Sequence, residues 1–167
     1  MKENLNIALV AHDARKEELI GWCRHNACFL SGHNLFATGT TGKLIKNMFK
    51  EIDNTDNYPG GEDEMNRYYD YKVTALLSGP LGGDQQIGAM IAEGKIDVLI
   101  FFCDNLITQG HQQDVGALVR LASLYNIPFA TNRTTADMII TSSLLGDSSY
   151  ERIIPDCINN YKNRNLK

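Results

Sequence analysis

Short apolar runs alternate with longer segments of helical periodicity along this chain. An unbroken apolar run such as NIALVA at residues 6–11 is typical of a strand that is covered on both faces. In the longer segments, apolar residues recur every three or four positions, as on the buried side of an amphipathic helix. The pattern predicts strands at residues 6–11, 34–38, 73–77, 96–102 and 128–131. It predicts helices at residues 16–30, 85–93, 114–125 and 135–145, and another that begins over residues 44–49.

The alternation of strands and helices predicts the fold class. We expect an α/β fold, a single doubly wound domain with a central five-stranded parallel sheet and helices on both faces. A chain of 167 residues fits one domain, so residues 1–167 are assigned to it. Residues 51–71 break the rhythm because they are acidic, weakly periodic and punctuated by Gly and Pro. We expect them to form a surface excursion between the second helix and the third strand.

Composition excludes several classes of protein. The net charge of −4 argues against nonspecific nucleic-acid binding, which favours a basic face. No apolar run approaches the roughly 20 residues of a membrane span, and the N-terminus leads straight into a strand without a signal peptide. The four cysteines lack the spacing of a metal site, so we expect reduced thiols in a cytoplasmic protein.

The segment LSGPLGGDQQ at residues 77–86 is the most informative stretch of the chain. A glycine-rich turn between a strand and a helix leaves backbone N–H groups exposed, where an anion can bind them. Asp84 is unexpected there, because a carboxylate beside an anion site costs electrostatic energy. We therefore predict that Asp84 acts as a base. Ser78 lacks the G-x-S-x-G pattern of a nucleophile, and we interpret it as a phosphate or backbone contact.

A second glycine-containing segment, TGTTG at residues 38–42, also suits a phosphate group. Its glycines free the backbone, its hydroxyls can donate hydrogen bonds, and the start of a helix follows. Lys16 could add a positive charge. A helix cap and turn explain the TGTTG pattern equally well, and Thr134 or Thr135 is expected to cap the last helix in the same way.

Carboxylates follow several of the predicted strands or begin the helices after them. Ligands in open α/β sheets bind beyond the carboxyl ends of the strands, so these groups can converge. They are Asp13, Asp84, Asp104 and Asp114. Each alone could be a helix cap, but together they indicate a site. His111 is a candidate proton shuttle or carbonyl polariser, whereas His25 and His33 receive no role. Phosphate held by Thr and Lys donors needs no metal, and we predict none.

Long motifs in this chain resemble those of methylglyoxal synthases. The matching stretches are IALVAHD at 7–13, FATGTTG at 36–42, LLSGPLGGDQQIGAMIAEGKIDVLIFF at 76–102, HQQDVGALVRLASLYNIPFATN at 111–132, TTAD at 134–137 and IP at 154–155. The resemblance implies conversion of dihydroxyacetone phosphate to methylglyoxal and inorganic phosphate without a cofactor. It also implies assembly into a homohexamer. We further predict that inorganic phosphate inhibits, because product and substrate would share the anion site.

The resemblance assigns roles to individual residues. Asp84 would be the general base, His111 would move protons at the substrate oxygens, and Asp13 and Asp114 would hold or tune these groups. The substrate and its phosphate would be bound by His12, Lys16, Thr38, Thr40, Thr41, Ser78, Gly79 and, near the C-terminus, Arg164.

The chain also departs from the family pattern. The excursion is longer than the usual connection, Cys103 replaces an aromatic residue, and Arg164 is out of register with the family's arginine. A related domain binds regulatory ligands in carbamoyl phosphate synthetase, so the alternative is a non-catalytic sensor of phosphorylated metabolites. A sensor would need the threonine segment but not Asp84 together with His111 and Asp114.

Overall fold

The computed structural model describes residues 4–53, 71–104, 106 and 112–164, without the side chains of residues 112–114. Five parallel strands form one sheet in the order β3-β2-β1-β4-β5. They are β1 (Asn6–Ala11), β2 (Asn34–Ala37), β3 (Lys72–Ala75), β4 (Val98–Phe102) and β5 (Phe129–Ala130). The predicted sheet is therefore confirmed, with strands that are mostly shorter than the apolar runs suggested.

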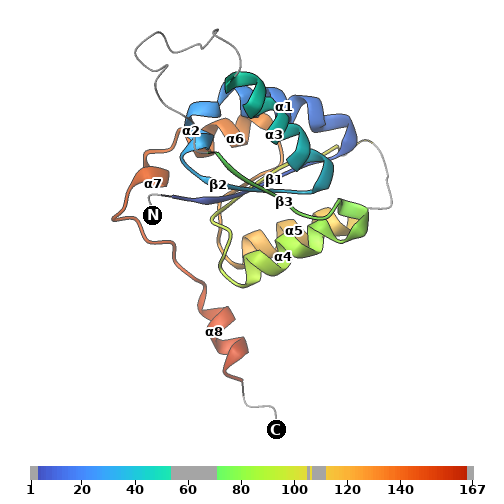
Figure 1. The fold of residues 1–167 in the computed structure, drawn as a ribbon. Helices are drawn as coiled ribbons and strands as arrows, with labels where there is room; N and C mark the ends of the chain where they lie inside the picture. The colour runs from blue at the N-terminus through green and yellow to red at the C-terminus, as the bar shows by residue number, and fades with distance from the viewer. Residues whose placement is uncertain (1–3, 54–70, 105, 107–111, 165–167) are drawn as a thin grey trace.

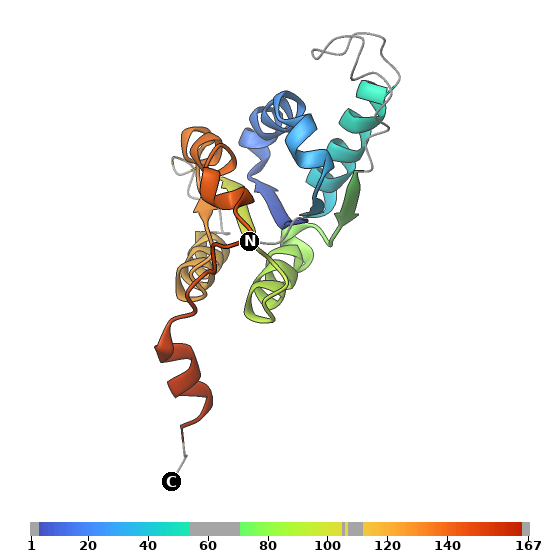
Figure 2. The same ribbon diagram turned by 90° about the vertical axis from the view of Figure 1, so that its left-hand side faces the viewer.

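Helices cover both faces of this sheet, as predicted (Figure 1). One face carries α1 (Lys16–His25), α3 (Gly39–Asp53) and α6 (Arg133–Ile140), and the other carries α4 (Gly83–Ala92) and α5 (Gln112–Leu124). Shorter elements connect them: η1 (Asp13–Arg15), α2 (Ala27–Ser31), η3 (Gly79–Leu81) and α7 (Ser143–Gly146). Figures 1 and 2 show that α8 (Asp156–Lys162) extends away from the sheet. No helix in the described part of the chain is both long and apolar enough to cross a bilayer.

The side chains of β1 build a separate core on each face. Ile7 and Leu9 pack with α1 and α3, whereas Ala8 and Val10 pack with α4 and α5. Trp22 of α1 is fully buried, and its indole Nε1–H donates a hydrogen bond to Asp137 Oδ1 of α6 at 2.7 Å. A buried indole N–H needs an acceptor, so this bond ties the two helices together.

Local hydrogen bonds explain where the helices differ from the prediction. The segment 16–30 is two helices, because Asn26 leaves helical geometry and its side chain donates to the Trp22 carbonyl at 2.9 Å. The helix expected from residue 135 begins at Arg133, capped by Asn132, whose side chain accepts the Thr135 N–H at 2.9 Å. The expected cap at Thr134 or Thr135 is therefore wrong. That helix also ends early, and α7 follows it separately.

The helix α3 begins and ends beyond its predicted bounds. It starts at Gly39, so most of the TGTTG segment forms its first turn instead of a loop. It continues to Asp53, so the start of the expected excursion is helical; residues 54–70 lie outside the described residues. Tyr71 stacks on Phe49 with ring centroids 4.5 Å apart, and its hydroxyl donates to Asp53. These contacts join the end of α3 to the start of β3.

His33 gives a testable pH dependence of stability. Its Nδ1 accepts the Leu5 backbone N–H at 3.3 Å, and its ring packs edge-on against Phe29. Burial lowers the pKa of His33, and a hydrogen bond with the Gly32 backbone opposes this only in part. The unfolded chain therefore binds a proton more readily, so His33 destabilises the fold as the pH falls.

We expect the free energy of unfolding to fall between about pH 7.5 and about pH 5.5, and to fall less in the variant His33→Asn. The Asn oxygen can still accept the Leu5 N–H but does not titrate. Urea unfolding of both proteins at the two pH values measures the difference. Equal losses would show that His33 has no part in the pH dependence.

Candidate active site

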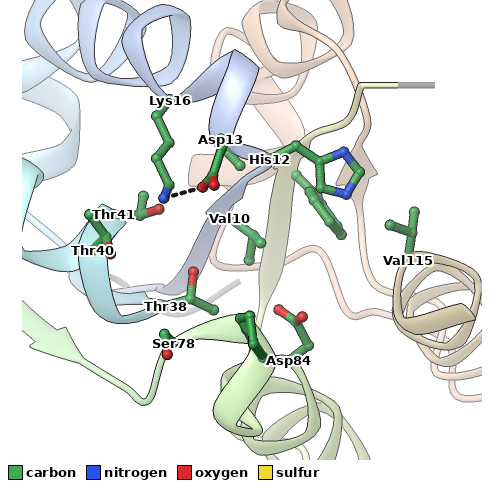
Figure 3. Close-up of a pocket in the computed structure, with 14 residues that line it drawn as sticks. Val10, His12, Asp13, Lys16, Thr38, Thr40, Thr41, Ser78, Asp84 and Val115 are labelled. Carbon is green, nitrogen blue, oxygen red and sulfur yellow. Dashed lines mark hydrogen bonds and ion pairs between the residues drawn. The ribbon is translucent and has the colours of Figure 1, made fainter. Parts of the chain in front are cut away.

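A cavity of about 280 Å³ lies at the carboxyl ends of the central strands. The chain order reverses between β1 and β4, and open α/β sheets bind ligands at such a switch point. Most of the predicted site residues line this cavity: His12, Asp13, Lys16, Thr38, Thr40, Thr41, Ser78, Gly79 and Asp84. In Figure 3, Lys16, Thr40 and Thr41 lie at one end and His12 and Val115 at the other, with Asp84 between them.

The first turn of α3 can bind an anion. Its N–H groups have no acceptor within the helix, but Gly39 N–H bonds to the Leu77 carbonyl and Gly42 N–H to the Thr38 carbonyl, each at 2.9 Å. The Thr40 and Thr41 amides are left at the positive end of the helix dipole. Because these two residues also line the cavity, their amides are positioned to receive a phosphate group.

Glycine at positions 39 and 42 allows this helix end to approach β3 and the loop after it. A Cβ atom on Gly39 would lie 2.9 Å from the Ser78 nitrogen, and one on Gly42 would lie 2.9 Å from the Ala75 Cβ. Any side chain at either position would therefore push α3 away. The close approach brings Ser78 into the same cavity as the α3 amides.

The Thr41 hydroxyl is a buried polar group in need of a partner. Thr41 is only 1% exposed, and its Oγ1 has no hydrogen-bond partner in the described structure. Buried hydroxyls are nearly always hydrogen-bonded, since an unpaired one costs roughly 1–3 kcal/mol. Thr41 also lines the cavity, which makes its hydroxyl a candidate donor to a bound anion.

Lys16 brings a positive charge to this end of the cavity. Its Nζ lies 2.5 Å from Asp13 Oδ1, and its side chain is 21% exposed, compared with 85% for Asp13. Both residues line the cavity, so the ion pair lies in its wall. A bound phosphate would share this ammonium group with Asp13.

Asp84 is placed by the glycine-rich turn. Gly82 adopts a left-handed conformation with φ of 102°, and Gly83 N–H bonds to the Ser78 carbonyl at 3.0 Å, so Asp84 falls in the first turn of α4. Its carboxylate lies over Gly79, where an added Cβ would be 3.0 Å from Asp84 Oδ2. Figure 3 shows the carboxylate pointing into the cavity.

His12 has a defined tautomer. Its Nδ1 accepts the Asp104 backbone N–H at 2.8 Å, and a backbone N–H can only donate. Nδ1 is therefore unprotonated, so the neutral ring carries its proton on Nε2. The Asp104 carboxylate has a local role, because its Oδ1 accepts the Leu106 N–H at 3.1 Å. The sequence identified His12 as a site residue but gave no sign of this bond.

The remaining predicted residues are not brought into the cavity by the described structure. His111 lies outside the described residues. Asp114 belongs to α5, but its side chain is not described. Arg164 follows α8, is exposed, and places its guanidinium 3.8 Å from the centre of the Tyr161 ring. Among the described residues, no three His, Cys, Asp or Glu side chains gather closely enough to bind a metal.

The cavity also has apolar lining residues that were not predicted from the sequence. Val10, Phe101 and Val115 are among the residues that line it. Val10 and Phe101 are the next-to-last residues of β1 and β4, and nothing in an apolar run marks which of its residues will face a ligand. For Val115, the available signal was its position directly after Asp114, a predicted site residue.

Comparisons with known proteins identify the family to which this chain belongs. The family model described as the MGS-like domain matches residues 19–131. The methylglyoxal synthase of Proteus mirabilis is 50% identical over 151 residues, which cover 90% of this chain and 86% of that protein. The methylglyoxal synthase of Maridesulfovibrio salexigens is 53% identical over 145 residues, 85% of this chain and 86% of that protein.

A solved structure supports the same assignment. The crystal structure of methylglyoxal synthase from Elizabethkingia anophelis has a TM-score of 0.76 and 41% sequence identity, and the match covers 100% of this chain and 95% of that one. By sequence and by fold, this chain belongs to the MGS-like family, together with these methylglyoxal synthases.

Proposed function

We propose that this protein is a lyase that converts dihydroxyacetone phosphate to methylglyoxal and inorganic phosphate. One observation carries the proposal: the Asp84 carboxylate points into the same small cavity as the free end of α3 and the unpaired Thr41 hydroxyl. A base and a phosphate site at such short range suit a phosphorylated ketone of three carbons. The family membership supports this substrate.

Asp84 takes a proton from the hydroxymethyl carbon of the substrate, and an enediolate forms. The negative charge on its oxygen needs donors that are already in place. The His12 Nε2–H is one, because the Asp104 amide fixes the ring as a neutral donor. His111 and Asp114 remain predicted participants, and Asp13 acts by holding Lys16.

Phosphate then leaves from the neighbouring carbon. The bond that breaks must stand roughly perpendicular to the enediolate plane, since its electrons have to overlap with the π system. The phosphate site therefore has to fix a torsion angle as well as an anion. Donors from Thr40, Thr41, Ser78 and Lys16 surround the cavity end and suit this task.

Several further properties remain predictions from the sequence. They are a single domain over residues 1–167, a cytoplasmic location, a homohexamer and inhibition by inorganic phosphate. Arg164 is a candidate contact only if another subunit or another arrangement of the C-terminal segment brings it to a site. Light scattering of the purified protein tests the hexamer.

The purified protein should release methylglyoxal and inorganic phosphate in equal amounts from dihydroxyacetone phosphate. Both products are measured in the same reaction, with added phosphate as the inhibitor. Binding of the substrate without any turnover would favour the alternative, a non-catalytic sensor of phosphorylated metabolites. Rates that do not respond to added phosphate would contradict a shared anion site.

Asp84→Asn should fold normally and lose activity. A positioned general base contributes about 10²–10⁴ to the rate, so we expect kcat to fall by at least that factor. Asn keeps the shape of the side chain but cannot accept the proton. Circular dichroism serves as the control for folding. An Asn variant with more than about a tenth of the wild-type kcat would exclude Asp84 as the base.

Thr41→Val should weaken phosphate binding without destabilising the fold. A hydrogen bond to a charged group contributes about 1.5–3 kcal/mol, so the inhibition constant for phosphate should rise about tenfold or more. The variant also removes a buried hydroxyl that lacks a partner in the described structure, so its melting temperature should not fall. Thr74→Val, on the exposed edge strand β3, is the matched control and should change neither quantity. Equal phosphate inhibition in both variants would refute the role of Thr41.

A further inference from the structure

Gln86 makes a hydrogen bond that links α4, the helix that carries Asp84, to the loop after β3. We call this loop, residues 76–78, the phosphate loop, because Ser78 lines the cavity. Its side-chain Oε1 accepts the Leu77 backbone N–H at 2.9 Å. Gln86 lies in α4 two residues after Asp84, and Leu77 immediately precedes Ser78. The bond therefore connects the helix that carries the base to the loop that enters the cavity.

The Leu77 backbone also contacts the phosphate-binding helix. Its carbonyl accepts the Gly39 N–H at 2.9 Å, at the start of α3. The same carbonyl packs so closely against α4 that a Cβ on Gly83 would lie 2.0 Å from it. The first turns of α3 and α4 therefore meet at one residue of the chain.

Leu77 is held at this point by its backbone. The strand β3 ends at Ala75, and Leu76 N–H makes a further bond to the Ala37 carbonyl at 2.8 Å. Leu77 lies beyond that bond, and its side chain is 50% exposed. Because its side chain is only half buried, the backbone bonds to Gln86 and Gly39 contribute to holding this residue in place.

We propose that Gln86 is a positioning residue that sets the orientation of Asp84 relative to the phosphate site, and so decides the fate of the enediolate. This inference rests on the proposed function. After Asp84 takes the proton, the electron pair of the C–H bond forms the enediolate double bond. The enediolate can regain a proton, which restores the substrate. Alternatively, its electrons expel phosphate with the C–O bonding pair and leave the enol of methylglyoxal, which then becomes the ketone.

The two fates depend differently on geometry. Proton transfer needs only Asp84 and the carbon in contact, whereas loss of phosphate also needs the C–O bond aligned with the π system. A looser link between α4 and the phosphate loop should harm the second step more than the first. Gln86 should therefore act on the partition between the fates, and a residue needed only for folding would not.

The test compares Gln86→Met with Gln86→Glu in D₂O. Met has similar length but no acceptor oxygen, while Glu retains one. The Leu77 N–H is at an exposed position where water can replace the lost bond, so both variants should fold. Phosphate release is measured together with deuterium in the recovered dihydroxyacetone phosphate. Asp84→Asn, purified in the same way, reports any exchange by contaminating isomerase.

For Gln86→Met, misplacement of the reacting groups should lower phosphate release by about 10²-fold and raise deuterium incorporated per phosphate released by about tenfold. In Gln86→Glu, the rate of phosphate release and the deuterium incorporated per phosphate released should both be close to the wild-type values. Inhibition by inorganic phosphate should change little in either variant, because Gly39 still bonds to Leu77. Melting temperatures within a few degrees of the wild type would exclude a general loss of structure.

Three results would count against the proposal in different ways. A wild-type protein that releases no phosphate overturns the proposed function and this inference together. A wild type that turns over, with a Met variant that loses exchange and release in proportion, overturns the positioning role alone. A Met variant that behaves as the wild type does also overturns the positioning role and leaves the proposed function intact.

Discussion

The close packing of the start of α3 against the loop after β3 is the constraint on which the site depends. Gly39 and Gly42 make it possible, because an added Cβ at either position would lie 2.9 Å from an atom of β3 or its loop. This contact places helix amides, the Ser78 region and Asp84 around a cavity of about 280 Å³. A larger separation would leave an anion site and a carboxylate with no common ligand.

The cavity also brings groups that attract an anion close to a negatively charged carboxylate. The amides of α3 and the Lys16 ammonium favour an anion, whereas Asp84 is a carboxylate in the same cavity. Asp13 forms an ion pair with Lys16 and offsets part of its charge. The neutral ring of His12 adds a donor without adding a further cation. Under the proposed function, this division would let one small cavity stabilise a phosphate and keep a base that can accept a proton.

Much of this could be predicted from the sequence, because the relevant signals are local. Apolar runs located all five strands, and the rule that ligands bind at strand ends located Asp84, Thr40 and Ser78. The start of α3 was missed because its glycines indicate a turn when considered alone. They indicate a helix start only when their close neighbours in β3 and the following loop are known.

The contacts that the sequence could not reveal join distant parts of the chain. His12 meets the Asp104 amide across 92 positions, and that bond depends on how β1 and β4 align. The cap of α6 is Asn132 instead of a neighbouring threonine, since the choice depends on how the chain leaves β5. Arg164 is out of register in sequence and is not among the described residues that line the cavity; it lies against the Tyr161 ring instead.

The contacts between the end of α3 and the start of β3 bear on where this fold can accept a longer or shorter connection. The Phe49, Asp53 and Tyr71 contacts close the chain where α3 ends and β3 begins, at the sheet edge away from the strand ends that carry the cavity. The entropy of closing a loop grows only slowly with its length, so segments of many sizes fit between such fixed ends. We therefore expect this junction to accept insertions, through which natural divergence or a grafted peptide could add new recognition far from the cavity.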